Sequence, residues 1–213
     1  MKHIKFAIFD VGQVIYPFSL KPLVSLMQQK TTEPKVFINN HTPFQYDYKP
    51  YMKGNLTNEE FAKELCFFCR VPYTKDTLAE INKALHLGCG PRFAETQNAI
   101  KQLRANNIEI GLLSNALPIL ADTGTDIAKQ EYCFTSYDLK LLKPDTNIFL
   151  KVQQKLDVPF NQILFIDDKE ENVKSAQSLG INGIVFDKRN ILKEINSYIP
   201  NSLQISKTTH FSE

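Results

Sequence analysis

Residues 5–16 read KFAIFDVGQVIY, and this stretch decides the fold of the chain. A short apolar run, Lys5 to Phe9, ends at an acidic residue, Asp10. Such runs are typical of strands that are covered on both faces of a sheet. The stretch therefore predicts a buried strand that carries a carboxylate at its carboxyl end.

Four later segments repeat the short apolar pattern, and stretches with helical periodicity separate them. From residue 91 onward strand and helix alternate, which predicts an α/β fold with a doubly wound parallel sheet, because parallel strands need a helix-length connection. The expected later strands are Glu109–Ser114, Tyr132–Thr135, Gln162–Ile166 and Gly183–Phe186.

Residues 17–90 do not follow this alternation. Leu20–Gln29, Asn58–Cys69 and Lys75–Leu85 have helical patterns, with no strand pattern among them. We predict a small all-helical cap, inserted after the first strand and lying over the carboxyl edge of the sheet. The expected domains are a core of residues 1–16 and 91–199, the cap of residues 17–90, and a mostly polar tail of residues 200–213.

The composition excludes several classes of protein. A length of 213 residues fits one domain or one domain with an insertion, and 43% hydrophobic with 23% charged residues is ordinary for a globular chain. The formal charge of +2 gives no reason to expect a nucleic acid or an anionic membrane as partner. Neither a membrane-spanning run nor a signal-peptide pattern is found, so we predict a cytoplasmic monomer or homodimer.

The cysteines fit a reducing compartment. Cys66 and Cys69 form a CxxC pair, but no second pair at metal-binding spacing accompanies them. Buried, reduced thiols are the expected state.

Four polar motifs follow the expected strands or open a helix. Each alone has an ordinary interpretation as a strand end, a turn, a helix start or a helix cap. Their joint order predicts a catalytic site. The motifs are Asp10-Val11-Gly12-Gln13-Val14, Ser114-Asn115, Lys143-Pro144-Asp145, and Asp167-Asp168 followed by Asn172.

This order and spacing resembles the haloacid dehalogenase-like hydrolase superfamily, which is made up largely of phosphatases. The resemblance covers residues 1–16 and 91 to about 187, and it is closest to bacterial sugar-phosphate phosphatases whose first motif reads FDxGxV. It implies a Rossmann-like core with a small cap between the first two motifs. It also implies that the backbone carbonyl of Gly12 is a metal ligand.

The residues themselves suggest a mechanism. Asp10 is the expected nucleophile, because a carboxylate can attack phosphorus and form an aspartyl-phosphate. Mg²⁺ is the expected cofactor, since it prefers oxygen ligands, and Asp10, Asp167 and Asp168 can supply them. In the usual doubly wound order the strand ending at Ile166 lies beside the strand ending at Phe9, which would make Asp10 and Asp167 neighbours.

The remaining motif residues have expected roles around the phosphate. Ser114 and Lys143 can stabilise charge on the transferring phosphoryl group, and Lys143 can also keep Asp10 ionised. Asn172 is expected to orient Asp167 and Asp168. The predicted substrate-binding residues are Gly12, Gln13, Ser114, Asn115 and Lys143.

One position departs from the pattern. Most phosphatases of this superfamily have a second aspartate two residues after the nucleophile as general acid and base, and this chain has Gly12 there. A phosphatase could manage with a good leaving group, a substrate hydroxyl or a water. The alternatives are a 2-haloacid dehalogenase-like hydrolase and a catalytically weak phosphate- or partner-binding protein.

Substrate specificity is expected to come from the cap and from residues just after the nucleophile. Aromatic side chains there suit the apolar face of a sugar, but packing of the cap on the sheet is the favoured explanation for them. We predict a Mg²⁺-dependent phosphatase for a small phosphorylated metabolite, with a sugar phosphate as the favoured substrate. The candidate specificity residues are Gln13, Tyr16, Phe18, Phe44, Tyr46 and Tyr48.

Overall fold

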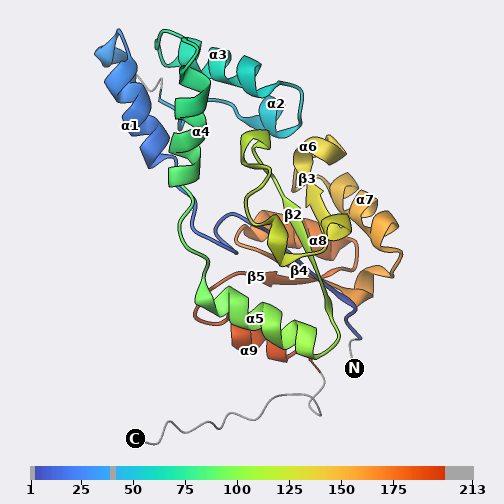
Figure 1. Ribbon diagram of the computed structural model, residues 1–213. Helices are drawn as coiled ribbons and strands as arrows, with labels where there is room; N and C mark the ends of the chain where they lie inside the picture. Colours follow the sequence, from blue (N-terminus) through green and yellow to red (C-terminus); the bar gives the residue numbers. More distant parts are fainter. Residues whose placement is uncertain (1–2, 39–41, 200–213) are drawn as a thin grey trace, which may run out of the picture.

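The computed structural model describes residues 3–38 and 42–199, and its centre is a five-stranded parallel sheet (Figure 1). The strand order is β3-β2-β1-β4-β5, which confirms the predicted α/β fold. The predicted tail of residues 200–213 lies outside the described residues. The strands are β1 (Phe6–Phe9), β2 (Glu109–Ser114), β3 (Cys133–Thr135), β4 (Ile163–Asp167) and β5 (Asn182–Val185).

Strand β1 lies in the middle of the sheet, with β2 on one side and β4 on the other. Phe9 pairs with Leu112 of β2 and with Ile166 of β4. The backbone N–H of Asp10 donates to the carbonyl of Ile166 over 2.8 Å. The predicted neighbourhood of the first and fourth strands is therefore present, and Asp10 and Asp167 follow adjacent strands at the same edge.

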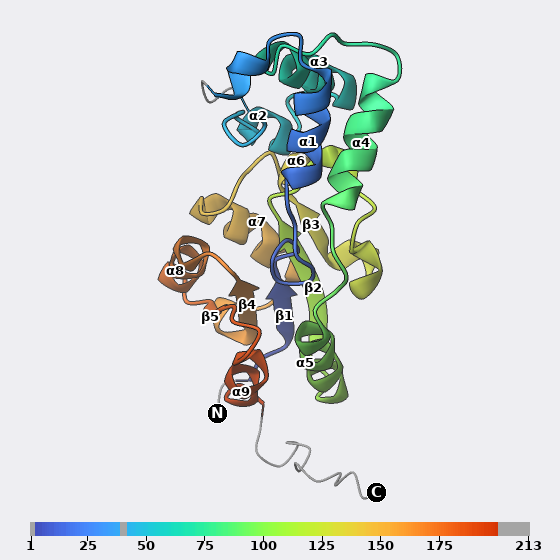
Figure 2. The same ribbon diagram turned by 90° about the vertical axis from the view of Figure 1, so that its left-hand side faces the viewer.

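Helices cover both faces of the sheet, and the two-residue period of β1 decides which side chain meets which face. Ala7 and Phe9 pack in a cluster with α5 (Ala94–Ala105) and α9 (Ile191–Asn196). Phe6 and Ile8 pack on the opposite face with α7 (Thr146–Leu156) and α8 (Glu170–Ser178) (Figure 2). This double covering explains why the strands are apolar on both sides.

Short elements complete the core. They are η2 (Pro118–Leu120), η3 (Thr125–Ile127), η4 (Gln130–Tyr132), α6 (Ser136–Leu139) and η5 (Phe160–Gln162).

Between β1 and α5 the described residues form helices joined by loops, with no strand among them. This segment contains α1 (Lys21–Lys30), η1 (Pro34–Phe37), α2 (Lys49–Met52), α3 (Asn58–Phe68) and α4 (Thr77–Leu87), above the carboxyl ends of the strands (Figures 1 and 2). Thr57 and Glu60 form the capping box that begins α3, and Leu23, Phe61 and Ile81 belong to a separate hydrophobic cluster. We therefore keep the division into core and cap as our interpretation.

Two linkers join the cap to the core, and they run side by side in opposite directions. Ser19 N–H donates to the carbonyl of Gly88 over 3.0 Å, and Gly90 N–H donates to the carbonyl of Pro17 over 2.9 Å. A Cβ at Gly88 would lie 2.2 Å from the carbonyl oxygen of Ser19, so the close approach of the linkers requires glycine there.

The cap is also held by a buried tyrosine. Tyr51 is fully buried and stacks on Phe61 with ring centroids 4.0 Å apart. Its hydroxyl accepts from the backbone N–H of Ile119 over 3.0 Å and donates to Asn58 Oδ1 over 2.6 Å. Because Ile119 follows β2, this hydroxyl fastens the cap to the core.

Tyr51→Phe is expected to lower the free energy of unfolding by about 1–3 kcal/mol, because it leaves a buried N–H group without a partner. Urea unfolding checks this value. Tyr46→Phe is the matched control, since among the described residues the hydroxyl of Tyr46 bonds only the exposed Glu64. Equal effects of the two substitutions would contradict the anchoring role of Tyr51.

Two of the four cysteines are buried as expected, whereas Cys89 and Cys133 are partly exposed. Cys66 and Cys69 are buried, and neither they nor Cys89 and Cys133 form a disulfide. Burial raises the pKa of the Cys66 thiol to about 11, so this thiol stays protonated at neutral pH. None of the described helices is long and apolar enough to cross a membrane.

Candidate active site

The ammonium group of Lys143 lies at the centre of the candidate site. Its Nζ donates to Asp10 Oδ1 over 2.7 Å, to Asp167 Oδ2 over 2.7 Å and to the carbonyl of Leu113 over 2.8 Å. A lysine has three N–H donors, so all of them are used. The side chain is 1% exposed. One buried cation therefore bridges the ends of β1 and β4.

Two hydrogen bonds with Asn115, the residue that follows β2, hold Lys143 in position. The backbone N–H of Lys143 donates to Asn115 Oδ1, and Asn115 Nδ2 donates to the carbonyl of Lys143, each over 2.9 Å. Asp145 then caps α7 by accepting from the backbone N–H of Asn147. The amide of Asn115 is engaged at both ends, so this geometry favours positioning of the lysine over the substrate contact that the sequence suggested.

The Asp167 carboxylate is fully buried and has several donors around it. Besides Lys143, it accepts from Asn172 Nδ2 at both oxygens, over 2.9 and 3.0 Å, and from the backbone N–H of Lys169 over 2.9 Å. A carboxylate has about four lone-pair positions, and these four hydrogen bonds occupy them. Asn172 thus contacts Asp167, as the sequence predicted, and orients it.

Asp168 has a different environment. It lines the cavity beside Asp10, and burial together with the charge of Asp167 raises its pKa. The sequence also suggested Asp168 as the cap of the following helix. The structure corrects this interpretation, because α8 begins after Lys169 and it is Asp167 that bonds the Lys169 N–H. The Asp168 carboxylate is thereby available to the cavity.

The three carboxylates suit a hard cation. Oxygen atoms of Asp10, Asp167 and Asp168 lie within 4.8 Å of one another. Burial raises the pKa of Asp10 to about 6, and the charge of Asp167 adds to this effect while Lys143 opposes it. Two like charges this close favour a bound cation. Asn172 Oδ1 is also buried without a partner in the described part of the chain.

Residues after β1 and β2 form the mouth of the site. Gln13 has a left-handed backbone conformation (φ 63°), and its Nε2 donates to the carbonyl of Phe18 over 2.7 Å. A Cβ at Gly12 would meet no atom within 4 Å. Ser114 ends β2 and lines the same cavity. Asp10, Gly12, Gln13, Ser114, Asn115, Lys143 and Asp168 thus line one cavity, with Asp167 buried behind them.

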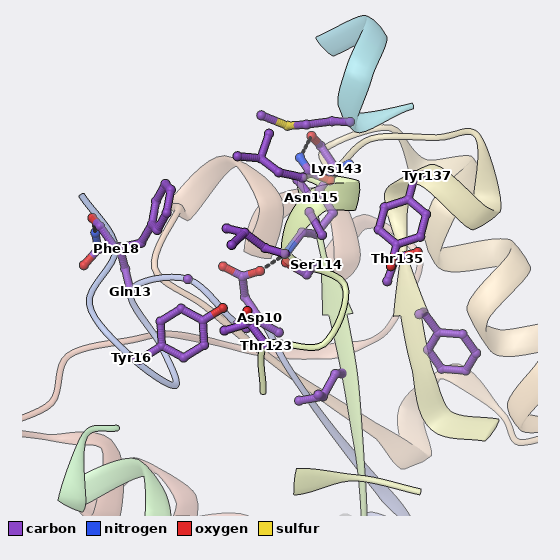
Figure 3. A pocket seen from close by; sticks show the side chains of 18 of the residues that line it. Asp10, Gln13, Tyr16, Phe18, Ser114, Asn115, Thr123, Thr135, Tyr137 and Lys143 are labelled. Atoms are coloured by element: carbon purple, nitrogen blue, oxygen red, sulfur yellow. Dashed lines mark hydrogen bonds and ion pairs between the residues drawn. The ribbon is translucent and has the colours of Figure 1, made fainter. Parts of the chain in front are cut away.

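The cavity of about 260 Å³ lies between the carboxyl ends of the strands and helix α2, because Asp10, Ser114 and Met52 all line it. Figure 3 shows Gln13, Tyr16 and Phe18 on one side of Asp10, with Thr135 and Tyr137 on the other. Further lining residues carry no sequence motif and were not foreseen. They include Met52, Leu117, Leu120, Thr123 and Tyr137.

The candidate specificity aromatics divide into two groups. Tyr48 lines the cavity together with Tyr16 and Phe18. Tyr46 packs against aromatic rings of the cap, and Phe44 is 55% exposed and does not line the cavity. Packing in the cap therefore accounts for Tyr46, while Tyr48 keeps a place beside the substrate site.

With this geometry described, comparison with known proteins gives the family. A model of haloacid dehalogenase-like hydrolases matches residues 8–180. The chain belongs to this hydrolase family. The match spans every motif of the site, from Asp10 to Asn172.

Curated relatives are distant and differ in activity. They include a sesquiterpene phosphatase of Aspergillus oryzae, 24% identical over 84% of this chain and 88% of the relative. A Pseudomonas fluorescens (S)-2-haloacid dehalogenase is 22% identical over 84% of this chain and 83% of its own. A drimenol cyclase of Aspergillus calidoustus is 24% identical over 85% of this chain.

The chain spans only 34% of that cyclase. It spans 16% of the mouse acyl-CoA dehydrogenase family member 10, to which it is 26% identical over 74% of this chain.

A solved structure shares the fold. It is a Bacteroides thetaiotaomicron enzyme of this family in complex with magnesium and inorganic phosphate, with a TM-score of 0.70 and 23% identity over 87% of this chain and 95% of that one.

Proposed function

We propose that the protein is a Mg²⁺-dependent phosphatase that hydrolyses a small phosphorylated metabolite through an aspartyl-phosphate on Asp10. The observation that carries this proposal is the position of Lys143 Nζ, 2.7 Å from Asp10 and 2.7 Å from Asp167, beside a cluster of three carboxylates. Magnesium and phosphate in the Bacteroides relative, and the name of the Aspergillus phosphatase, support it.

Asp10 and Asp168 are the proposed direct ligands among the carboxylates, together with the backbone carbonyl of Gly12. The hydrogen bonds of Asp167 to Lys143, Asn172 and Lys169 already use its lone pairs, so we assign it mainly to holding Lys143. When bound, Mg²⁺ supplies positive charge against both the carboxylate and the phosphoryl oxygens.

The residues of the chain divide the chemistry between them. Lys143 binds one oxygen of Asp10 and so orients the carboxylate toward the cavity. An oxygen of Asp10 attacks phosphorus, and the leaving oxygen departs with the electron pair of its bond to phosphorus. The Ser114 hydroxyl and the Lys143 charge stabilise the phosphoryl oxygens. Water then attacks the phosphorus, and the carboxylate of Asp10 is released.

The alternative activity is that of a dehalogenase, because one relative of the chain has that name. Displacement of a halide by an aspartate needs no metal. Asp10 would still be the nucleophile in a dehalogenase, but Asp168 beside it would have no cation to bind. Three carboxylates within 4.8 Å of one another therefore favour the phosphatase.

Removal of the metal is expected to decrease phosphate release at least about 100-fold, because a bound divalent cation contributes several kcal/mol of charge stabilisation. The assay compares phosphate release from a panel of monophosphates, sugar phosphates included, with Mg²⁺ and with EDTA. Adding back Mg²⁺ is the control. Metal-free release of halide from 2-haloacids, without phosphate release, would establish the dehalogenase. Absence of both phosphate release and halide release would indicate a binding protein.

A further inference from the structure

The wall of the cavity around Asp10 is mainly apolar. Side chains from three separate segments contribute to it: the linker after β1, the α2 region of the cap and the loop after β2. A volume of about 260 Å³ lies below the roughly 300–1,000 Å³ of pockets for drug-sized ligands, so the occupant is small. The apolar and aromatic side chains of the wall include Tyr16, Phe18, Tyr48, Met52, Leu117 and Leu120.

Several polar groups in this wall are already bonded to the protein. Gln13 Nε2 donates to the carbonyl of Phe18, the Tyr48 hydroxyl donates to the carbonyl of Pro43 over 2.8 Å, and Asn115 is engaged at both ends. A sugar would bring several hydroxyls into this wall, and each buried hydroxyl without a partner weakens binding. The wall therefore favours an apolar leaving group over a polyol.

The residue at the position of the usual general acid, Gly12, also bears on which leaving group the site accepts. Gly12 has no side chain, although a Cβ there would meet no atom within 4 Å, so crowding does not explain the glycine. Of the described residues that line the cavity, only Asp10 and Asp168 carry carboxylates, and none is a histidine. Asp10 and Asp168 are already assigned to the nucleophile and the metal. The departing oxygen consequently receives no proton from a carboxylic acid or an imidazole.

A phenol can leave without such help. Phenols ionise near pKa ~10, as tyrosine does, whereas water, whose anion resembles an alkoxide, ionises near ~15.7. When the general acid is missing, the rate of hydrolysis therefore falls far less for an aryl phosphate than for an alkyl phosphate. A flat ring also suits the aromatic side chains of Tyr16 and Phe18, which flank Asp10 in Figure 3.

We propose that the site is selective for the monophosphate ester of a small phenol, an inference that rests on the proposed phosphatase function. The bond from Asp10 to phosphorus forms as the bond from phosphorus to the phenolic oxygen breaks. The phenolate carries the electron pair away and takes a proton from water. A second water attacks phosphorus, the bond to Asp10 breaks, and that water's proton passes to the released phosphate or to solvent.

The test compares phenyl phosphate with cyclohexyl phosphate, which is similar in size and apolar but has a poor leaving group, and with glucose 1-phosphate, which has a better leaving group but many hydroxyls. With Mg²⁺ present, kcat/KM for phenyl phosphate is expected to exceed that for cyclohexyl phosphate at least 100-fold and that for glucose 1-phosphate at least 10-fold. Equal or higher values for either competitor would overturn the phenol assignment and leave the phosphatase standing. Absence of metal-dependent release from all three and from the wider monophosphate panel would instead refute the proposed function.

Two variants test separately the contribution of the apolar wall and that of the missing general acid. Phe18→Ala is expected to raise KM for phenyl phosphate about 10-fold, whereas Phe67→Ala, at an aromatic residue of α3 that is 74% exposed, leaves it unchanged. Gly12→Asp is expected to raise kcat on cyclohexyl phosphate and so to reduce the preference for phenyl phosphate at least 10-fold. An unchanged KM in the first variant, or an unchanged preference in the folded second variant, would contradict the inference.

Discussion

Replacing Asp10 by asparagine is expected to reduce metal-dependent phosphate release at least about 10⁴-fold, because a neutral amide is a weak nucleophile. The fold is expected to survive. The Asn side-chain oxygen can still accept from Lys143, and the bond from the backbone N–H of residue 10 to Ile166 does not involve the side chain. Phosphate release and thermal unfolding, measured on the same preparation, check both expectations.

Asp76→Asn is the matched control for this experiment. Asp76 is exposed and makes no side-chain cap bond at the start of α4, so its substitution should change neither activity nor stability. Normal turnover in Asp10→Asn would exclude Asp10 as the nucleophile and with it the aspartyl-phosphate. Trapping of phosphate on the wild-type chain, but not on the variant, would support the intermediate directly.

Replacing Lys143 by methionine is expected to affect activity and stability together. The substitution removes the cation between Asp10 and Asp167 and the donor to the carbonyl of Leu113. Two carboxylates then remain buried without their cation, which costs about 3–5 kcal/mol of unfolding free energy. Loss of the charge opposite the phosphoryl group should lower kcat by about 10²–10⁴-fold. Urea unfolding and phosphate release measure the two effects.

Lys151→Met is the control for Lys143→Met. Lys151 donates to the carbonyl of Leu139 over 3.0 Å and forms no ion pair within the described residues, so its loss should cost about 1 kcal/mol or less. A double-mutant cycle with Asp10→Asn should show that the two substitutions together destabilise less than the sum of their separate effects, because both act on one ion pair. Additive effects would contradict the coupling of Lys143 and Asp10.

Much of the core could be predicted because its signals are local. The predicted strands Glu109–Ser114 and Tyr132–Thr135 match β2 and β3 to within one residue, since short apolar runs between polar ends have few alternatives in a doubly covered sheet. The predicted helix Asn58–Cys69 likewise begins at the residue where α3 begins. The short helix α2 was missed, because four residues of KPYM carry too little periodicity.

The cavity could not be predicted in the same way. Tyr46 and Tyr48 are separated by a single residue, yet Tyr46 packs within the cap and Tyr48 lines the cavity. Leu117 and Leu120 reach the cavity from the loop after β2 without any motif. Side chains from several distant segments form this wall, and no short stretch of sequence records which of them will meet.

The sequence by itself determined the class of the fold, the central strand that ends at Asp10 and the set of motif residues, because apolar periodicity and strand-end motifs are properties of neighbouring residues. Tertiary structure alone decided that Lys143 bridges two carboxylates, that Asn115 holds this lysine, and that Asp167 has no lone pair to spare. It also decided the apolar character of the cavity. These features depend on distances between residues far apart in the chain, which only the packing of strands, loops and cap brings together.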